Sequence, residues 1–333
     1  MQAIGTTPVI DFHWHFLVEE VFDQGHAHSP ATGFGHHQAP PRLAALIEKM
    51  KNPKLALEDM DRLKIDMSVM SSATVIQPTS WAEPKTELGL VQRVNDTVAD
   101  WAARSPRRIV GSFVLPLQDM DLALRELNRA VGLGLQVANI PSEVRGTYLG
   151  DRKFWPFWEA VQDLEVVAFM HPEGGKCAWF QQFGMWNSIA QSLEEAKFMA
   201  SMIYEGVLES FPRLKVVVAH GAGYFPHNMG RLDRNVKNAP QSMKNITRKP
   251  SEYLRSVHYD SCLYDPSVLS ALIKIVGSDR LVMGSDYPIG EGDPLGFVNR
   301  CGDIGDLEKR MILGGTAAKL LGGVRDDRAE SSR

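Results

Sequence analysis

Two histidines separated by a single residue offer the first recognisable chemistry in the chain, in the segment Asp11-Phe12-His13-Trp14-His15. The surrounding run, Val9 to His15, is short and apolar, as is typical of a buried strand. Because side chains two apart on a strand point to the same face, His13 and His15 could both offer imidazole nitrogens to one metal ion. The spacing alone is a weak signal, since strand histidines more often pack or form hydrogen bonds.

Three further residues with metal-binding side chains end predicted strands. His171, His220 and Asp286 each close an apolar run, and a proline or glycine follows each within two positions. The carboxyl ends of the strands form the catalytic face of a parallel barrel, so all five side chains would converge there. Imidazole and carboxylate are ligands that a borderline cation such as Zn²⁺ accepts. The alternative is a coincidence of polar residues at strand ends.

The elements that must position these residues alternate along the chain between short apolar runs and longer segments of helical spacing. The eight predicted strands are Val9 to His15, Met67 to Val75, Ile109 to Leu117, Leu135 to Ile140, Val166 to His171, Leu214 to His220, Val257 to Cys262 and Leu281 to Asp286. The clearest predicted helices are Glu87 to Ala103, Asp121 to Val131, Phe154 to Leu164, Ser192 to Glu209 and Pro266 to Val276. A strand followed by a helix, eight times, predicts an α/β fold of the (β/α)8 TIM-barrel type.

We expect a single barrel domain over residues 1–325, because no internal repeat or low-complexity linker divides the chain. Residues 24–41 are crowded with Gly, Pro, His and Ala without any period, which predicts an inserted loop after the first strand. The histidines of this loop are expected to be solvated or to line the pocket rather than to hold a second metal: His26, His28, His36 and His37. Residues 326–333 are expected to form a polar C-terminal tail.

Composition excludes several classes of protein. The 333 residues include 36 Lys+Arg and 40 Asp+Glu, a formal charge of −4, which disfavours a nucleic-acid binder with a strongly basic face. The three cysteines, Cys177, Cys262 and Cys301, are too few and too far apart for a disulfide framework or a CxxC metal knuckle. No apolar stretch is long enough to span a membrane, and Met1 to Pro8 lacks the features of an export signal. We therefore expect a cytoplasmic protein without a membrane partner.

The motifs together resemble a known family. Asp11-x-His13-x-His15, His171-Pro172, Ala219-His220-Gly221-x-Gly223 and Gly284-x-Asp286-Tyr287-Pro288 are similar to the amidohydrolase superfamily, in the decarboxylase branch typified by aminocarboxymuconate-semialdehyde decarboxylase. The likeness covers nearly the whole chain. It extends to Ser105-Pro106-Arg107-Arg108, Phe211-Pro212-Arg213-Leu214-Lys215, Gly230-Arg231 and Ile312-Leu313-Gly314-Gly315-Thr316-Ala317-Ala318.

The resemblance implies one divalent metal ion, usually Zn²⁺ with Mn²⁺ as the alternative. Its ligands would be His13, His15, His171 and Asp286, while His220 would remain unligated. Hydrolases of the superfamily place a carboxylated lysine at the end of the fourth strand, where this chain has no lysine in residues 136–140. A dinuclear, lysine-bridged centre is therefore disfavoured.

This set of groups predicts acid–base chemistry beside a metal. A metal lowers the pKa of bound water from about 15.7 toward about 7, so His220, with help from Asp286, could move a proton between that water and a substrate. The first interpretation is non-oxidative decarboxylation of a small conjugated or aromatic carboxylic acid in aromatic catabolism. The alternative is hydrolysis of a carbon–carbon bond in a ring-cleavage product, of a lactone or of an amide. A third is a barrel that binds a ligand without turnover.

Candidate substrate contacts are fewer and weaker. The substrate is expected to be a small organic anion, and Arg231 could clamp its carboxylate, although an arginine on a helix is often simply solvated. By resemblance Arg231 would reach the site of a neighbouring subunit, which implies a homodimer or a higher homo-oligomer. Trp179, Phe183 and Trp186 follow His171 in a Gly-rich loop and could stack on a planar substrate or cover the barrel rim.

Overall fold

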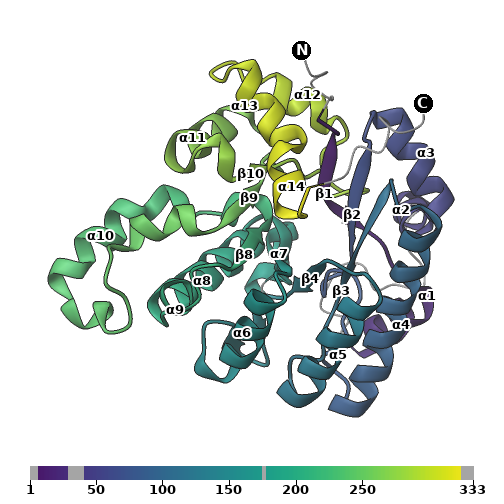
Figure 1. Cartoon of the computed structure of the whole chain (residues 1–333), viewed down its shortest axis with the longest axis horizontal. Coiled ribbons are helices and arrows are strands. Elements are labelled where there is room, and N and C mark those ends of the chain that lie inside the picture. The colour runs from purple at the N-terminus through teal and green to yellow at the C-terminus, as the bar shows by residue number, and fades with distance from the viewer. Residues whose placement is uncertain (1–6, 29–40, 175–177, 324–333) are drawn as a thin grey trace.

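Eight parallel strands form one sheet that curls into a nearly closed barrel in the computed structural model, which describes residues 7–28, 41–174 and 178–323 (Figure 1). In sheet order the strands are β1 (Ile10–His15), β2 (Met67–Ser71), β3 (Ile109–Phe113), β4 (Val137–Ile140), β7 (Val167–Met170), β8 (Lys215–Val218), β9 (His258–Asp260) and β10 (Leu281–Val282). A separate hairpin, β5 (Glu143–Val144) and β6 (Thr147–Tyr148), follows β4. The predicted barrel is confirmed, and all eight predicted strands contain an observed one.

Backbone hydrogen bonds join the last strand segment to the first. The amide of Phe12 donates to the carbonyl of Met283 at 2.8 Å, and the amide of His15 donates to the carbonyl of Tyr287 at 2.9 Å. The rings of Trp14 and Tyr287 also stack, with centroids 3.6 Å apart. These contacts bring residue 286 beside residues 13 and 15, although more than 270 positions separate them along the chain.

A β-bulge in β1 directs the two histidines. The register with β2 shifts between Asp11 and Trp14, so that β1 carries an extra residue there. Asp11 fixes the bulge, because its Oδ1 accepts hydrogen bonds from the amide of His13 at 3.0 Å and from the amide of Ser285 at 3.1 Å. Bulges re-aim side chains near functional sites. Here the bulge allows Phe12 to join an apolar cluster and the next residue, His13, to join the polar group described below.

The barrel is filled by side chains rather than open. One buried apolar cluster draws members from every strand of the barrel except β9, and it is closed by residues of the last helix: Ile10, Phe12, Met67, Val69, Val110, Val137, Val167, Phe169, Val217, Ala219, Val282, Ala317 and Leu320. A larger cluster packs the outer face of the strands against the helices. Because both faces are covered, every residue of β1, β2 and β3 is buried, including the polar ones.

Helices cover the outside of the strands (Figure 1). They are α1 (Glu19–His28), α2 (Pro41–Lys51), α3 (Pro53–Leu63), α4 (Pro84–Arg104), α5 (Met120–Gly132), α6 (Trp155–Asp163), α7 (Met185–Ser188), α8 (Ala190–Tyr204), α9 (Val207–Ser210), α10 (Met229–Asn238), α11 (Pro266–Val276), α12 (Pro294–Asn299), α13 (Asp306–Arg310) and α14 (Thr316–Leu320). Asp265 caps α11 by accepting a hydrogen bond from the amide of Ser267 at 2.8 Å. Among the helices described, none is long and apolar enough to cross a membrane.

Two sequence expectations differ from the structure in detail. The segment expected to be one helix from Ser192 to Glu209 is two, α8 and α9, because Gly206 adopts a φ of 86° between them. A Cβ at Gly206 would also lie 2.8 Å from the carbonyl oxygen of Asn245, so a glycine is required there. The expected inserted loop starts at Gln24, but α1 continues through His28, and residues 29–40 of that loop lie outside the described residues.

Glu87 on α4 gives the fold a pH-dependent element. Its side chain is buried, its carboxylate accepts hydrogen bonds from Gln118 and Thr79, and burial raises its pKa to about 7 despite those bonds. The unfolded chain releases this proton near the ordinary value of 4.5, so the folded state binds more protons between about pH 4.5 and 7. The free energy of unfolding is therefore expected to fall through that window as pH rises.

Glu87→Gln is expected to remove this dependence, because the amide cannot ionise. Relative to the variant, the wild-type protein should lose up to about 3 kcal/mol of stability between pH 4.5 and 7.5, measured by denaturant unfolding at a series of pH values. Glu83→Gln, at an exposed position just before the same helix, is the matched control and should follow the wild type. If the free energy of unfolding depends on pH in the same way for Glu87→Gln and the wild type, Glu87 is not the source of the pH dependence.

Candidate active site

Three imidazoles and one carboxylate meet at the carboxyl ends of β1, β7 and β10. His13, His15, His171 and Asp286 are all buried, and each offers one ligand atom within 4.8 Å of the others. The Oδ1 atom of Asp286 lies 2.8 Å from Nε2 of His15 and 3.3 Å from Nε2 of His13. The four residues that the sequence suggested as metal ligands are therefore brought together.

The hydrogen-bond partners of these histidines fit a metal ion. Nδ1 of His171 lies 2.9 Å from the carbonyl oxygen of Pro172, so it carries the proton and leaves the Nε2 lone pair free. Nε2 of His171 is buried and has no hydrogen-bond partner within the described part of the chain. An unsatisfied buried nitrogen is unfavourable, and coordination to a cation would satisfy it. A tetrahedral zinc site takes this combination of imidazole and carboxylate donors.

Burial sets the protonation of two of the imidazoles. It lowers the pKa of His15, and burial together with the neighbouring histidines lowers the pKa of His171 well below its ordinary value. Both rings are therefore neutral near pH 7, which is the form that coordinates metals. Burial opposes ionisation of Asp286, but the surrounding histidines outweigh it and hold the pKa of that carboxyl well below its usual range. His15 and His171 thus present neutral nitrogens beside one negative oxygen. Burial opposes a charge on His13, but Asp286 and Asp260 outweigh it and raise the pKa of His13 to about 9, so a cation bound there would displace a proton.

Asp260 orients His13 and was not identified as a site residue from the sequence. Its Oδ2 atom lies 2.6 Å from Nδ1 of His13, and both side chains are fully buried. A carboxylate on the second ring nitrogen fixes the tautomer and turns Nε2 toward the metal position. The seventh predicted strand, Val257 to Cys262, contains Asp260 but extends two residues beyond it, whereas the observed β9 ends at Asp260.

His220 lies beside this group and has its own carboxylate partner. Nδ1 of His220 is 2.6 Å from Oε1 of Glu195, a fully buried residue of α8, and Nε2 of His220 lies 3.8 Å from Oδ2 of Asp286. Burial opposes a charge on the ring, but Glu195 and Asp286 outweigh it and raise the pKa of His220 well above its ordinary value. Burial raises the pKa of Glu195 itself to about 7. No sequence signal distinguished Glu195 from other helix carboxylates.

The backbone is unusual at the strand ends that carry these groups. His220, Tyr264 and Asp286 have φ values of 48°, 58° and 58°, in the left-handed region that non-glycine residues rarely adopt. Each follows a different strand, β8, β9 and β10 respectively. Strained backbone persists where surrounding structure fixes it, and it concentrates at functional sites. The observation supports this end of the barrel as the site of chemistry.

The four candidate substrate-binding residues differ in how far they are buried in the structure. Trp186 is partly buried and packs against an apolar cluster that also contacts Ile289, three residues beyond Asp286. Trp179 and Phe183 are 57% and 92% exposed, so they do not pack over the site within this chain. Arg231 is exposed on α10, which projects away from the strands (Figure 1). Of the four, Trp186 is the one whose apolar cluster also contacts the chain just beyond Asp286.

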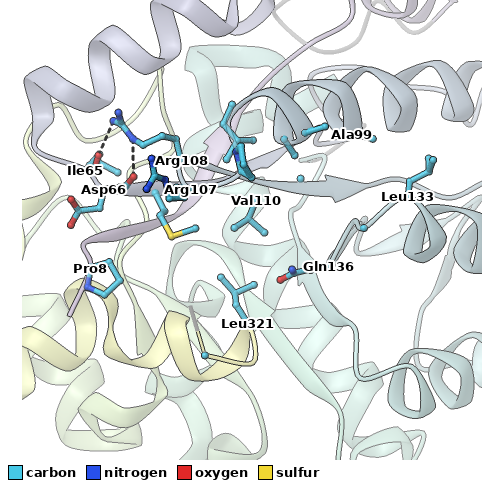
Figure 2. Close-up of a pocket in the computed structure, with 18 of the residues that line it drawn as sticks. Pro8, Ile65, Asp66, Ala99, Arg107, Arg108, Val110, Leu133, Gln136 and Leu321 are labelled. Atoms are coloured by element: carbon cyan, nitrogen blue, oxygen red, sulfur yellow. Dashed lines mark hydrogen bonds between the residues drawn. The ribbon is translucent and has the colours of Figure 1, made fainter. Parts of the chain in front are cut away.

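A cavity of about 1220 Å³ lies at the opposite end of the barrel (Figure 2). Its lining includes Pro8, Asp66 and Gln136, which precede β1, β2 and β4. Arg108 crosses this end, donating to the carbonyl of Asp66 at 2.9 Å and to Oδ1 of Asp61 at 2.7 Å. Because barrel enzymes carry their chemistry at the carboxyl ends of the strands, this cavity is separate from the candidate active site.

Known proteins share both the sequence and the architecture. The profile of the amidohydrolase family matches residues 10–323. The 2-amino-3-carboxymuconate-6-semialdehyde decarboxylase of Dictyostelium discoideum is 31% identical over 277 residues, which cover 81% of this chain and 77% of that protein.

Two solved structures extend the comparison. The 5-carboxyvanillate decarboxylase of Sphingomonas paucimobilis superposes with a TM-score of 0.84 at 25% identity, covering 96% of this chain and 100% of that one. The 5-carboxyvanillate decarboxylase of Novosphingobium aromaticivorans, complexed with manganese and 4-hydroxy-3-methoxy-5-nitrobenzoic acid, superposes with a TM-score of 0.86 at 20% identity, covering 95% of this chain and 96% of that one. The second likeness concerns the fold alone.

Proposed function

Because the chain belongs to the amidohydrolase family, in the branch of the aminocarboxymuconate-semialdehyde decarboxylases, we propose that it is a metal-dependent, non-oxidative decarboxylase. Its substrate would be a small aromatic or conjugated carboxylic acid, as in the relatives that carry the name decarboxylase. One observation carries the proposal most directly. Nε2 of His171, which has no hydrogen-bond partner among the described residues, belongs to one group with His13, His15 and Asp286, and His220 lies beside them.

In this proposal His13, His15, His171 and Asp286 hold one divalent cation. Zinc suits three imidazoles and a carboxylate, and manganese is the ion bound in the Novosphingobium relative. When bound, the cation supplies a positive charge that stabilises negative charge developing on the substrate. Asp260 and the carbonyl of Pro172 keep the rings of His13 and His171 oriented toward it.

The chain's own acid–base group is His220. Decarboxylation breaks the bond between a substrate carbon and its carboxylate, CO₂ leaves, and the electron pair stays on the carbon, which then takes a proton. Nε2 of His220 faces the site, while Glu195 holds Nδ1 at 2.6 Å and favours the protonated ring. His220 can therefore hold the proton at Nε2 and deliver it to that carbon. Solvent would restore the proton after each turnover, because the ring is partly exposed.

Two substrate contacts remain part of the proposal. Trp186 is proposed to lie at the rim of the site, where its ring could stack on a planar acid. Arg231 is proposed to bind the substrate of a neighbouring subunit, because it is exposed on a helix that extends away from its own strands. This second contact requires a homodimer or a higher homo-oligomer.

The decisive experiment measures products rather than binding. Purified protein of known metal content would be incubated with a panel of phenolic and muconate-type carboxylic acids, recording CO₂ release and product mass together. The expected result is a product lighter than its substrate by the mass of CO₂, formed only while the metal is present. Protein treated with a chelator and then dialysed is the control, and returning the ion should restore turnover. Cleavage products whose combined mass exceeds that of the substrate by one water, without CO₂, would make the enzyme a hydrolase.

A further inference from the structure

Cys262 is a buried thiol that the proposed reaction does not use. It follows β9 by two residues and is 1% exposed, and its amide donates a hydrogen bond to Oδ1 of Asp260 at 3.1 Å. It forms no disulfide in the structure. The Asp260 contact holds the backbone of Cys262 next to the carboxylate that orients His13. Cys262 is therefore fixed at the same end of the barrel as the proposed metal ligands.

His220, Cys262 and Asp286 form a second group of ligand atoms. Each offers one atom, and the three atoms lie within 4.8 Å of one another. Asp286 belongs to both groups through its two oxygens. Oδ1 faces His13 and His15, whereas Oδ2 lies 3.8 Å from Nε2 of His220 and 3.4 Å from the hydroxyl of Tyr264. One carboxylate could thus bridge two cations without the carboxylated lysine that the chain lacks at the end of β4.

We propose that His220, Cys262 and Asp286 form a second cation site that selects soft or borderline ions such as Zn²⁺ and Cd²⁺ over Mn²⁺. Sulfur, imidazole nitrogen and carboxylate oxygen are all zinc donors, and three protein ligands leave a position open for water or substrate. Thiolate favours such ions, whereas manganese prefers oxygen ligands. As the ion binds, the thiol proton of Cys262 and the proton on Nε2 of His220 both leave to solvent, so the step needs no oxidant or reductant.

Occupation of this site is inhibitory, a consequence that rests on the proposed function. Binding of the second ion uses the Nε2 lone pair of His220, and the ring can then no longer carry a proton at that atom. Excess zinc should therefore lower turnover by about 100-fold at saturation, in line with the contribution of a single acid–base group. Excess manganese should leave turnover unchanged, because it does not bind the thiol. The first ion would remain bound by its own four residues.

The binding itself is tested without any substrate. Protein equilibrated with excess Zn²⁺ should hold two ions per chain, and Cys262→Ser should hold one. Protein equilibrated with Co²⁺ should show a sulfur-to-cobalt charge-transfer absorption in the near ultraviolet. The first group contains no sulfur, so this absorption reports the second site alone. Cys301→Ser, which removes the other buried free cysteine of the structure, is the matched control and should keep the absorption.

Two outcomes separate this proposal from the proposed function. One zinc per chain in the wild type, or an unchanged cobalt absorption in Cys262→Ser, would overturn the second site even in an active decarboxylase. If no acid releases CO₂, metal content and the cobalt absorption still decide whether the site exists. Cys262→Ala provides a second variant should serine perturb folding at this buried position. In an active enzyme, both Cys262 variants should keep the one-ion activity and resist excess zinc.

Discussion

Asp286→Asn is expected to lose bound metal and catalytic activity together. The substitution keeps the shape of the side chain but removes the negative charge that lies 2.8 Å from His15 and 3.3 Å from His13. Loss of a residue that only orients a ligand typically weakens metal binding or activity by 10- to 100-fold, so loss of a direct ligand should exceed about 100-fold. Metal content after dialysis and the rate of CO₂ release are the two measurements.

Asp260→Asn is expected to have a smaller effect than Asp286→Asn on metal binding and on rate. Asp260 contacts Nδ1 of His13 rather than the metal position, so metal binding should weaken by about 10- to 100-fold. The order wild type, Asp260→Asn, Asp286→Asn is expected for both metal content and rate. Asp279→Asn, at an acidic residue that pairs with Arg255 away from the site, is the control and should behave as the wild type. Full activity in Asp286→Asn would remove Asp286 from the metal site.

His220→Asn is expected to keep the metal and lose turnover. His220 lies 3.8 Å from Oδ2 of Asp286 and belongs to the acid–base part of the site, not to the four-residue group. Removing a positioned acid–base group typically slows the reaction by 10²- to 10⁴-fold. The variant should therefore keep the ion of the four-residue group, as the wild type does, while its kcat falls by about that factor. Metal analysis checks that the ion is kept, and steady-state kinetics on the same preparation checks that kcat falls.

Glu195→Gln tests whether Glu195 acts through His220, by positioning its ring and favouring its protonated form. Glu195 contacts Nδ1 of His220 at 2.6 Å, and its charge favours the protonated ring. The neutral amide should lower the pKa of His220. The ring would then lose its proton at a lower pH, so the alkaline limb of the kcat profile should shift to lower pH. His227→Ala, at an exposed histidine of the loop after β8, is the control for both variants. Loss of the metal in His220→Asn would instead make His220 a ligand.

The chain order of motifs was sufficient to predict the barrel and the meeting of five side chains at one end, and the family resemblance selected the four-residue group from them. Strand alternation requires His13 and His15 to share a face, and parallel strands require residues at their carboxyl ends to meet. Local sequence was therefore enough to predict that four side chains lie close together: His13, His15, His171 and Asp286. The β-bulge that places Phe12 and His13 on successive inward positions was not predicted. It depends on hydrogen bonds that Asp11 accepts from the amide of His13 and from the amide of Ser285, which is distant in the chain.

Tertiary structure alone decided the partners of these residues. Glu195 reaches His220 because α8 packs beside the end of β8, a relation that depends on helix packing and leaves no local pattern. Arg231 and Phe183 are exposed in the folded chain, and their contacts with substrate remain predictions.

The sequence by itself determined which strand ends carry imidazole and carboxylate groups, because these residues stand where apolar runs end along the chain. Only the tertiary structure decided that one oxygen of Asp286 faces His13 and His15 while the other faces His220, with Cys262 close to both His220 and Asp286. Those distances depend on how the barrel closes between β10 and β1 and on the backbone after β8, β9 and β10, and segments so far apart in sequence become neighbours only in the folded chain.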